Sequence, residues 1–246
     1  MAVAYSGTKH DDDAAAELVV VRGDIANPDQ TEWVNFLASS MHTRWSRWFY
    51  ALMVKRGFDL VFASAVLVLL SPLLLLVALA IRLDSHGPAL FRQTRVGRGG
   101  RAFTIFKFRT MEYEPGHELS LFKDEDGVWK HKIRNDPRVT RVGKLLRRTS
   151  VDELPQLINI VLGQMSIVGP RPELPQIVGK YEPWQHQRHL VRPGLTGWWQ
   201  VSGRSDRPMH LNTELDVFYV ENISIGLDVR ILWKTMRVVL GGFGAF

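Results

Sequence analysis

The hydrophobic pattern of the chain changes sharply at about residue 31. Residues 1–30 are polar and acidic and keep neither a helical nor a strand period, so we expect a flexible acidic tail. Residues 31–56 place apolar side chains three and four positions apart on one helical face with basic residues around it; this stripe comprises Trp33, Leu37, Met41, Trp45, Trp48 and Leu52. A Trp-rich amphipathic helix of this kind is typical of a membrane interface, although a docked helix or a homodimer contact would give the same pattern.

The longest apolar stretch runs from Leu60 to Ile81. Its 22 residues carry no charge and are long enough to cross the roughly 30 Å hydrocarbon core of a bilayer. Ser71 and Pro72 interrupt it, and because proline removes a backbone hydrogen bond, we predict a break there with the Ser71 hydroxyl bonding a freed carbonyl. Basic residues flank both ends, which favours a re-entrant helix hairpin over residues 57–83 instead of a simple span.

Residues 84–246 are expected to form the catalytic domain. Segments 89–96 and 102–108 partly alternate, and the glycine-rich turn between them predicts a small β-hairpin, followed by a long loop over 112–136. Helical patterns follow at 139–148, 152–163, 173–181, 209–222 and 227–240. The last of these is amphipathic and fits either an anionic bilayer surface or the domain core. The predicted fold class is α+β, mostly helical, in a monotopic membrane protein.

The distribution of charge adds a constraint on partners. The first 40 residues hold two basic and seven acidic residues, which leaves the rest of the chain with 29 basic and 18 acidic residues and a net charge of +11. Such a basic body predicts an anionic partner, either a phosphorylated substrate or anionic membrane lipids. No nucleic acid is expected, since no recognised nucleic-acid motif accompanies the charge. The absence of cysteine excludes thiolate catalysis and Fe–S clusters.

Two adjacent carboxylates, Asp152 and Glu153, lie just before an apolar helical pattern. Free N–H groups at a helix N-terminus favour negative charge, and Arg147 one turn earlier adds a phosphate-binding fork. Because Mg²⁺ takes one or two carboxylates together with phosphate oxygens, this spacing suits phosphoryl transfer. Two simpler interpretations stay open: Ser150 and Glu153 fit a capping box, and the cations fit a solvated basic face.

Further cations accompany this pair, namely Lys107, Arg109 and Arg171. Seven motifs then occur in order along the chain: Lys55-Arg-Gly-Phe-Asp59, Ser71-Pro72, Gly87-Pro-Ala-Leu-Phe91, Phe106-Lys-Phe-Arg-Thr-Met111, Thr149-Ser-Val-Asp-Glu-Leu-Pro-Gln156, Val168-Gly-Pro-Arg-Pro172 and Pro193-Gly-Leu-Thr-Gly197. Together they resemble the motifs of the bacterial sugar transferases, the monotopic polyprenyl-phosphate phosphoglycosyl transferases. The resemblance covers about residues 50–246 and is strongest to short exopolysaccharide-type members.

The resemblance implies an enzyme of the bacterial inner membrane with its catalytic domain on the cytoplasmic face. Such enzymes transfer a sugar 1-phosphate, here a hexose 1-phosphate, from a UDP-sugar to undecaprenyl phosphate with Mg²⁺ and release UMP. By resemblance, Asp152 would be the nucleophile that forms a covalent phosphosugar intermediate, and Glu153 would help Asp152 to hold the metal. The expected phosphate-binding residues are Arg171, Arg147, Lys107 and Arg109.

One departure from the family pattern concerns Trp199-Gln-Val-Ser-Gly-Arg204, where Ser202 replaces the usual Asn and puts an amide contact there in doubt. Two other functional classes stay open. A non-catalytic membrane scaffold would bind anionic lipids without turnover, and a metal-dependent hydrolase of nucleotide sugars would act without a lipid acceptor.

Overall fold

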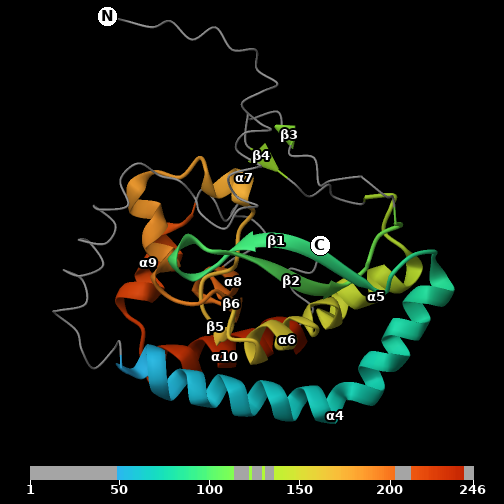
Figure 1. Ribbon diagram of the computed structural model, residues 1–246, viewed down its shortest axis with the longest axis horizontal. Coiled ribbons are helices and arrows are strands. Elements are labelled where there is room, and N and C mark those ends of the chain that lie inside the picture. The colour runs from blue at the N-terminus through green and yellow to red at the C-terminus, as the bar shows by residue number, and fades with distance from the viewer. Residues whose placement is uncertain (1–48, 114–121, 124–128, 131–135, 203–211, 241–246) are drawn as a thin grey trace, which may run out of the picture.

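A computed structural model describes residues 49–113, 122–123, 129–130, 136–202 and 212–240 (Figure 1). The predicted tail and most of the predicted Trp-rich helix lie outside these residues. The helices are η1 (Tyr50–Val54), α4 (Lys55–Asp84), η2 (Arg98–Gly100), α5 (Arg141–Thr149), η3 (Val151–Glu153), α6 (Gln156–Val161), α7 (Pro175–Val178), η4 (Pro183–Leu190), α8 (Trp198–Val201), α9 (Glu214–Glu221) and α10 (Ile225–Leu240). The strands are β1 (Leu90–Val96), β2 (Ala102–Phe108), β3 (Phe122–Lys123), β4 (Trp129–Lys130), β5 (Ser166–Val168) and β6 (Gly194–Thr196). The α+β, mostly helical class is confirmed.

The apolar stretch forms one continuous helix, α4, in which Pro72 is internal. The helix is therefore not interrupted at Ser71 and Pro72, and it bends along its course toward the end of the molecule that holds α5 (Figure 1). Pro72 has no N–H for the carbonyl of Val68, and the Ser71 hydroxyl donates to that carbonyl instead, at 2.8 Å. The predicted repair by Ser71 is confirmed, and it explains how the helix continues through the proline.

The surface of α4 is largely apolar and exposed. In the described part of the chain it is the one helix long and apolar enough to cross a membrane, and only 6% of its most apolar window is buried. A core helix of a soluble protein would bury most of that window. The exposed large apolar residues on it include Phe58, Val61, Val68, Leu69, Leu75, Leu76, Leu79 and Leu83. An exposed apolar surface of this extent is typical of a site that interacts with a membrane or another protein.

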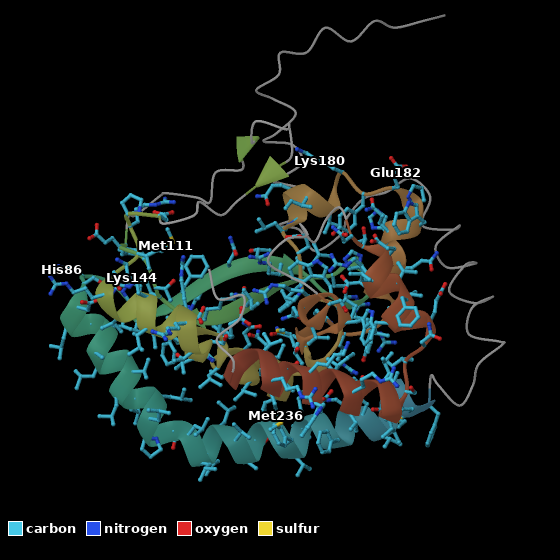
Figure 2. The ribbon with its side chains drawn as sticks, turned by 180° about the vertical axis from the view of Figure 1, so that it is seen from behind. His86, Met111, Lys144, Lys180, Glu182 and Met236 are labelled. Atoms are coloured by element: carbon cyan, nitrogen blue, oxygen red, sulfur yellow. The ribbon has the colours of Figure 1, made fainter. Side chains whose placement is uncertain are left out.

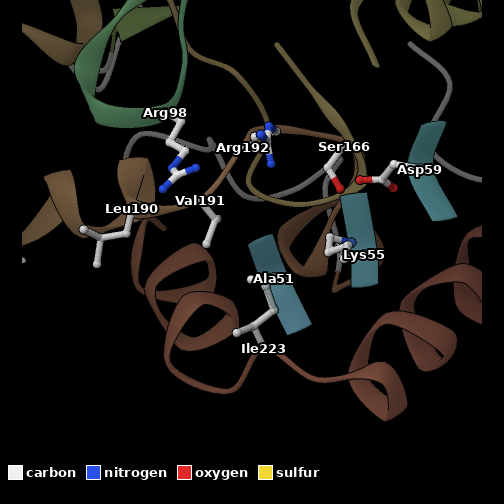
Figure 3. A pocket seen from close by; sticks show the side chains of 9 residues that line it. All are labelled: Ala51, Lys55, Asp59, Arg98, Ser166, Leu190, Val191, Arg192 and Ile223. Atoms are coloured by element: carbon white, nitrogen blue, oxygen red, sulfur yellow. The ribbon is translucent and has the colours of Figure 1, made fainter. Parts of the chain in front are cut away.

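The N-terminal end of α4 is fixed to the domain by buried polar contacts. Lys55 Nζ lies 2.6 Å from Asp228 Oδ2 of α10, and both side chains are almost fully buried. Asp59 Oδ1 accepts a hydrogen bond from Ile167 N of β5 at 3.1 Å. Figure 3 shows Asp59 facing Ser166 and Lys55 below them, in a small pocket. The structure shows no boundary at residues 56–57, since η1 runs directly into α4 at Lys55.

The C-terminal end of α4 is fixed to the same domain. Asp84 Oδ2 accepts from Val142 N of α5 at 3.0 Å, and Arg109 donates to the carbonyl of Ser85 at 2.9 Å. Figure 2, seen from behind, shows His86, which follows α4, and Lys144 of α5 at this end of the molecule. Both ends of an exposed apolar helix therefore contact one polar domain.

The predicted β-hairpin is confirmed, with β1 and β2 antiparallel and Leu90 opposite Phe108. Asn159 of α6 holds β2: its Oδ1 accepts from Phe106 N at 3.0 Å and its Nδ2 donates to Thr104 O at 2.7 Å. Asn159 is fully buried, so these bonds are made away from water. The amide thus fixes α6 against the strand that carries Lys107.

A parallel pair, β5 and β6, was not predicted from the sequence. Ser166 lies opposite Gly194, and Val168 opposite Thr196. A Cβ atom at Gly194 would lie 2.1 Å from the backbone N of Gly169, so only glycine permits this approach. The motifs at Val168–Pro172 and Pro193–Gly197 are therefore in contact, and this contact positions the segment that carries Arg171.

The other differences concern lengths and short elements. The predicted loop over 112–136 contains the two-residue strands β3 and β4, which pair antiparallel. Every predicted helix in this domain exists but begins or ends elsewhere, as with α7, which covers only four residues. The main core joins α4, α6, β2, β5, α9 and α10 through residues that include Ala63, Ile105, Ile160, Met165, Tyr219 and Ile231.

Candidate active site

A strained turn carries the two adjacent carboxylates. Helix α5 ends at Thr149, and Ser150 follows in the left-handed conformation with φ of 58°. It is the one non-glycine residue with positive φ in the described chain, a conformation that costs an L-residue about 1 kcal/mol. The sharp turn starts η3, which holds Asp152 and Glu153 before α6 begins at Gln156.

The capping-box interpretation of Ser150 and Glu153 is wrong. Ser150 makes no side-chain capping bond to η3. The Glu153 carboxylate turns away from the backbone and binds two cations: Lys107 Nζ lies 2.9 Å and Arg171 Nη2 lies 2.7 Å from its Oε1. Arg171 Nη1 also lies 3.4 Å from Oε2. We call Glu153, Lys107 and Arg171 the cation cluster.

The cation cluster is mostly but not fully removed from water. The side chains of Lys107 and Glu153 are 18% exposed, and that of Arg171 is 21% exposed. Lys107 comes from β2 and Arg171 from the segment after β5, so the cluster joins three distant parts of the sequence. A ligand can reach these groups while their charges interact more strongly than they would in bulk water.

The pKa values of the two carboxyl groups shift in opposite directions. Burial raises the pKa of Asp152, and the neighbouring charge of Glu153 raises it further, against the opposing effect of Lys107, Arg171 and Arg147. Burial also acts to raise the pKa of Glu153, but Arg171 and Lys107 outweigh it and hold that pKa well below its usual value. Adjacent carboxylates with divergent pKa values are typical of catalytic sites, where the two groups take different roles.

The structure separates the remaining predicted phosphate-binding residues. Arg147 Nε donates to Thr110 Oγ1 at 2.9 Å, and its charge acts on Asp152, so it flanks the site. Arg109 instead donates to carbonyls at the C-terminal end of α4, those of Ser85 and His86. Because its guanidinium caps that helix, the structure does not bring Arg109 together with the cation cluster.

Sequence reasoning missed a second layer of buried polar residues behind the cluster. Arg95 of β1 lies 3.4 Å from Glu173 Oε1. Arg188 of η4 donates to the carbonyl of Arg171 at 2.6 Å and to Asp216 Oδ2 of α9 at 2.6 Å. Arg188 and Arg95 thus fix the backbone at Arg171 and at Pro172, which follows it. No sequence spacing points to them, because their partners lie on separate elements.

The carboxylate set is compatible with Mg²⁺. Among the residues that the structure describes, no group of three or more His, Cys, Asp or Glu side chains forms a metal site. Mg²⁺ nevertheless needs only one or two protein carboxylates as ligands when substrate phosphate oxygens and water molecules supply the others. Asp152 and Glu153 therefore fit the expected ion if an anionic substrate joins them.

The paired carboxylates, the two cations on Glu153 and the exposed apolar helix are together compatible with an enzyme that acts at a membrane on an anionic substrate. Residues 50–242 match the family model described as bacterial sugar transferase. The chain belongs to that family, as its motifs suggested.

Three relatives illustrate the range of the family. An exopolysaccharide production protein of Rhizobium leguminosarum bv. phaseoli is 43% identical over 196 residues, which cover 75% of this chain and 94% of the relative. The UDP-N-acetylgalactosamine-undecaprenyl-phosphate N-acetylgalactosaminephosphotransferase of Aeromonas hydrophila is 43% identical over 78% of this chain and 45% of the relative. The UDP-glucose:undecaprenyl-phosphate glucose-1-phosphate transferase of Escherichia coli is 41% identical over 75% of this chain and 39% of the relative. The match therefore spans less than half of these two transferases.

Proposed function

We propose that this protein transfers a sugar 1-phosphate, specifically a hexose 1-phosphate, from a UDP-sugar to undecaprenyl phosphate and releases UMP. This would be the first membrane step of exopolysaccharide or glycan synthesis. The observation that carries the proposal is the pair of adjacent carboxylates in opposite electrostatic environments, with Lys107 and Arg171 on one of them. The names of the relatives support the same donor and acceptor classes.

The proposed reaction proceeds in two steps at Asp152. A carboxylate oxygen of Asp152 attacks the phosphorus that carries the sugar, the bond from that phosphorus to the UMP oxygen breaks, and UMP leaves. A phosphate oxygen of undecaprenyl phosphate then attacks the same phosphorus, and the bond to Asp152 breaks, which restores the carboxylate. Two steps allow a soluble donor and a membrane-bound acceptor to use one site in turn.

The remaining residues bind and orient the phosphate groups. Lys107 and Arg171 supply a charged donor and a guanidinium fork, and Arg147 adds charge beside Asp152. Asp152 and Glu153 would hold Mg²⁺, which when bound neutralises charge on the diphosphate. The raised pKa of Asp152 indicates a less stabilised and therefore more reactive carboxylate once it is ionised.

The proposed membrane arrangement is re-entrant, with the catalytic domain on the cytoplasmic face of the bacterial inner membrane. A helix of 30 residues is about 45 Å long, so a straight crossing would carry one end to the opposite side of the bilayer. Lys55 and Asp84, at its two ends, both contact the catalytic domain, which supports return to one face. The basic body of the protein favours the cytoplasmic face and anionic lipids.

The test is UMP release by the purified protein from a panel of UDP-sugars with Mg²⁺, with and without undecaprenyl phosphate. Sustained release that needs the lipid and is lost in Asp152→Asn supports the transferase and identifies the sugar. Release without lipid at the same rate would instead indicate a hydrolase. No release with any donor, from protein with intact secondary structure, would favour the membrane scaffold.

A further inference from the structure

Glu153 occupies a place that fits a phosphate group. Its Oε1 accepts from Lys107 Nζ at 2.9 Å and from Arg171 Nη2 at 2.7 Å, while Oε2 lies 3.4 Å from Arg171 Nη1. A guanidinium fork with an added ammonium holds the oxygens of a phosphate in the same way as those of a carboxylate. The donors that the proposed function assigns to the substrate are therefore already engaged by a side chain of the protein.

We propose that the Glu153 carboxylate occupies the binding position of the substrate phosphate in the free protein, which we call its stand-in role. When a divalent cation binds, Glu153 leaves Lys107 and Arg171 to contact the cation, and Lys107 and Arg171 then bind the substrate phosphate. The inference rests on the proposed function for the identity of the ligand. It adds a regulated exchange: the anion site opens when the cation arrives.

The burial of the cluster is the reason for this coupling. The side chains of the cluster are about one-fifth exposed, so a ligand can reach them. If the Glu153 carboxylate left Lys107 and Arg171 without gaining another partner, however, its charge would be poorly solvated. A phosphate entering alone would also meet the negative charges of Glu153 and the adjacent Asp152. A divalent cation offers the displaced carboxylate a partner, so cation and phosphate should bind with positive coupling.

The test measures binding, with UMP and inorganic phosphate as probes, by titration calorimetry in EDTA and in Mg²⁺. Wild-type protein is expected to bind UMP about tenfold more tightly with Mg²⁺. Glu153→Gln removes the internal anion, so without metal it should bind both probes about tenfold more tightly than wild type, with little further gain from Mg²⁺. Glu153→Ala provides a second variant in which no amide contacts the cations.

Asp152→Asn is the matched control, because it removes one negative charge from the same turn but leaves the ion pairs of Glu153 with Lys107 and Arg171 in place. It should gain clearly less metal-free affinity than Glu153→Gln. An equal gain in the control, or no gain in either Glu153 variant with intact fold, would overturn the stand-in role.

The two proposals fail in different measurements. If inorganic phosphate follows the expected pattern while UMP does not bind, the stand-in role holds and the nucleotide substrate is wrong. If UMP release is normal but Glu153→Gln gains no metal-free affinity, the transferase holds and the stand-in role is wrong.

Discussion

Two ion-paired groups of this protein both contact Arg171 but differ in their exposure to water. Arg188 and Asp216 are each 1% exposed and 2.6 Å apart, and Arg188 also bonds Tyr181 Oη and the carbonyl of Arg171. The cation cluster around Glu153 is about one-fifth exposed and has two cations for one carboxylate. The buried Arg188–Asp216 pair, which we call the sealed pair, stabilises the fold because its donors are used by protein groups. The more exposed cation cluster, which we call the open cluster, can exchange a protein partner for a ligand.

The largest effect is expected from breaking the sealed pair. Asp216→Ala leaves the Arg188 guanidinium buried without its carboxylate, which should lower the free energy of unfolding by about 3–5 kcal/mol. Thermal or denaturant unfolding in detergent measures this loss. Glu214→Ala, at an exposed position of the same helix, is the control and should change stability by less than about 0.5 kcal/mol. Equal losses in both would contradict the structural role of the pair.

Breaking the open cluster should affect activity more than stability. In Lys107→Met, Glu153 keeps Arg171 as a partner, so we expect a stability loss of about 1–2 kcal/mol. Turnover in the UMP-release assay should fall about 100-fold or more, because a phosphate-binding charge is lost. Lys144→Met, on the exposed face of α5, should retain activity. A Lys107 variant with normal turnover would remove this residue from the proposed site.

The pH dependence of turnover distinguishes the two carboxylates. The pKa of Asp152 is raised above 3.8 by burial and by Glu153, so its carboxyl is protonated over a wider acid range than that of an ordinary aspartate. A nucleophile must be ionised, and kcat should therefore fall as the pH drops through this raised value. Glu153, with a lowered pKa, stays ionised there. An acid limb at or below the usual aspartate pKa, with the fold intact by circular dichroism, would argue against Asp152 as the nucleophile.

The smallest effect concerns the strained turn that presents the open site. Ser150→Gly removes the cost of the left-handed backbone but makes the unfolded chain more flexible, so we expect a net change within about 1 kcal/mol, toward stabilisation. Ser150→Val introduces a β-branched side chain at this position, so we expect it to be less stable than Ser150→Gly by more than about 1 kcal/mol. The order of the unfolding midpoints, Gly above Ser above Val, is the measurement. Val at or above Ser would show that the turn relaxes without strain.

The sequence alone determined the features that depend on neighbouring residues. The exposed apolar helix follows from 22 uncharged positions, and the contact of the Ser71 hydroxyl with the Val68 carbonyl follows from the missing N–H of Pro72. The β-hairpin follows from alternation around a glycine-rich turn. Periodicity and turn chemistry are local, so these features could be predicted, and the adjacency of Asp152 and Glu153 is visible in the sequence itself.

Only the tertiary structure decided the partners of the charged residues. Glu153 matched a local capping box, but its contacts come from Lys107, 46 positions away, and Arg171, 18 positions away. Arg109 belongs to the same short motif as Lys107, yet it faces the end of α4. The parallel pair of β5 and β6 likewise depends on close approach at Gly169 and Gly194. Contacts between distant segments depend on how whole elements pack, and that packing is not encoded in the spacing of any one segment.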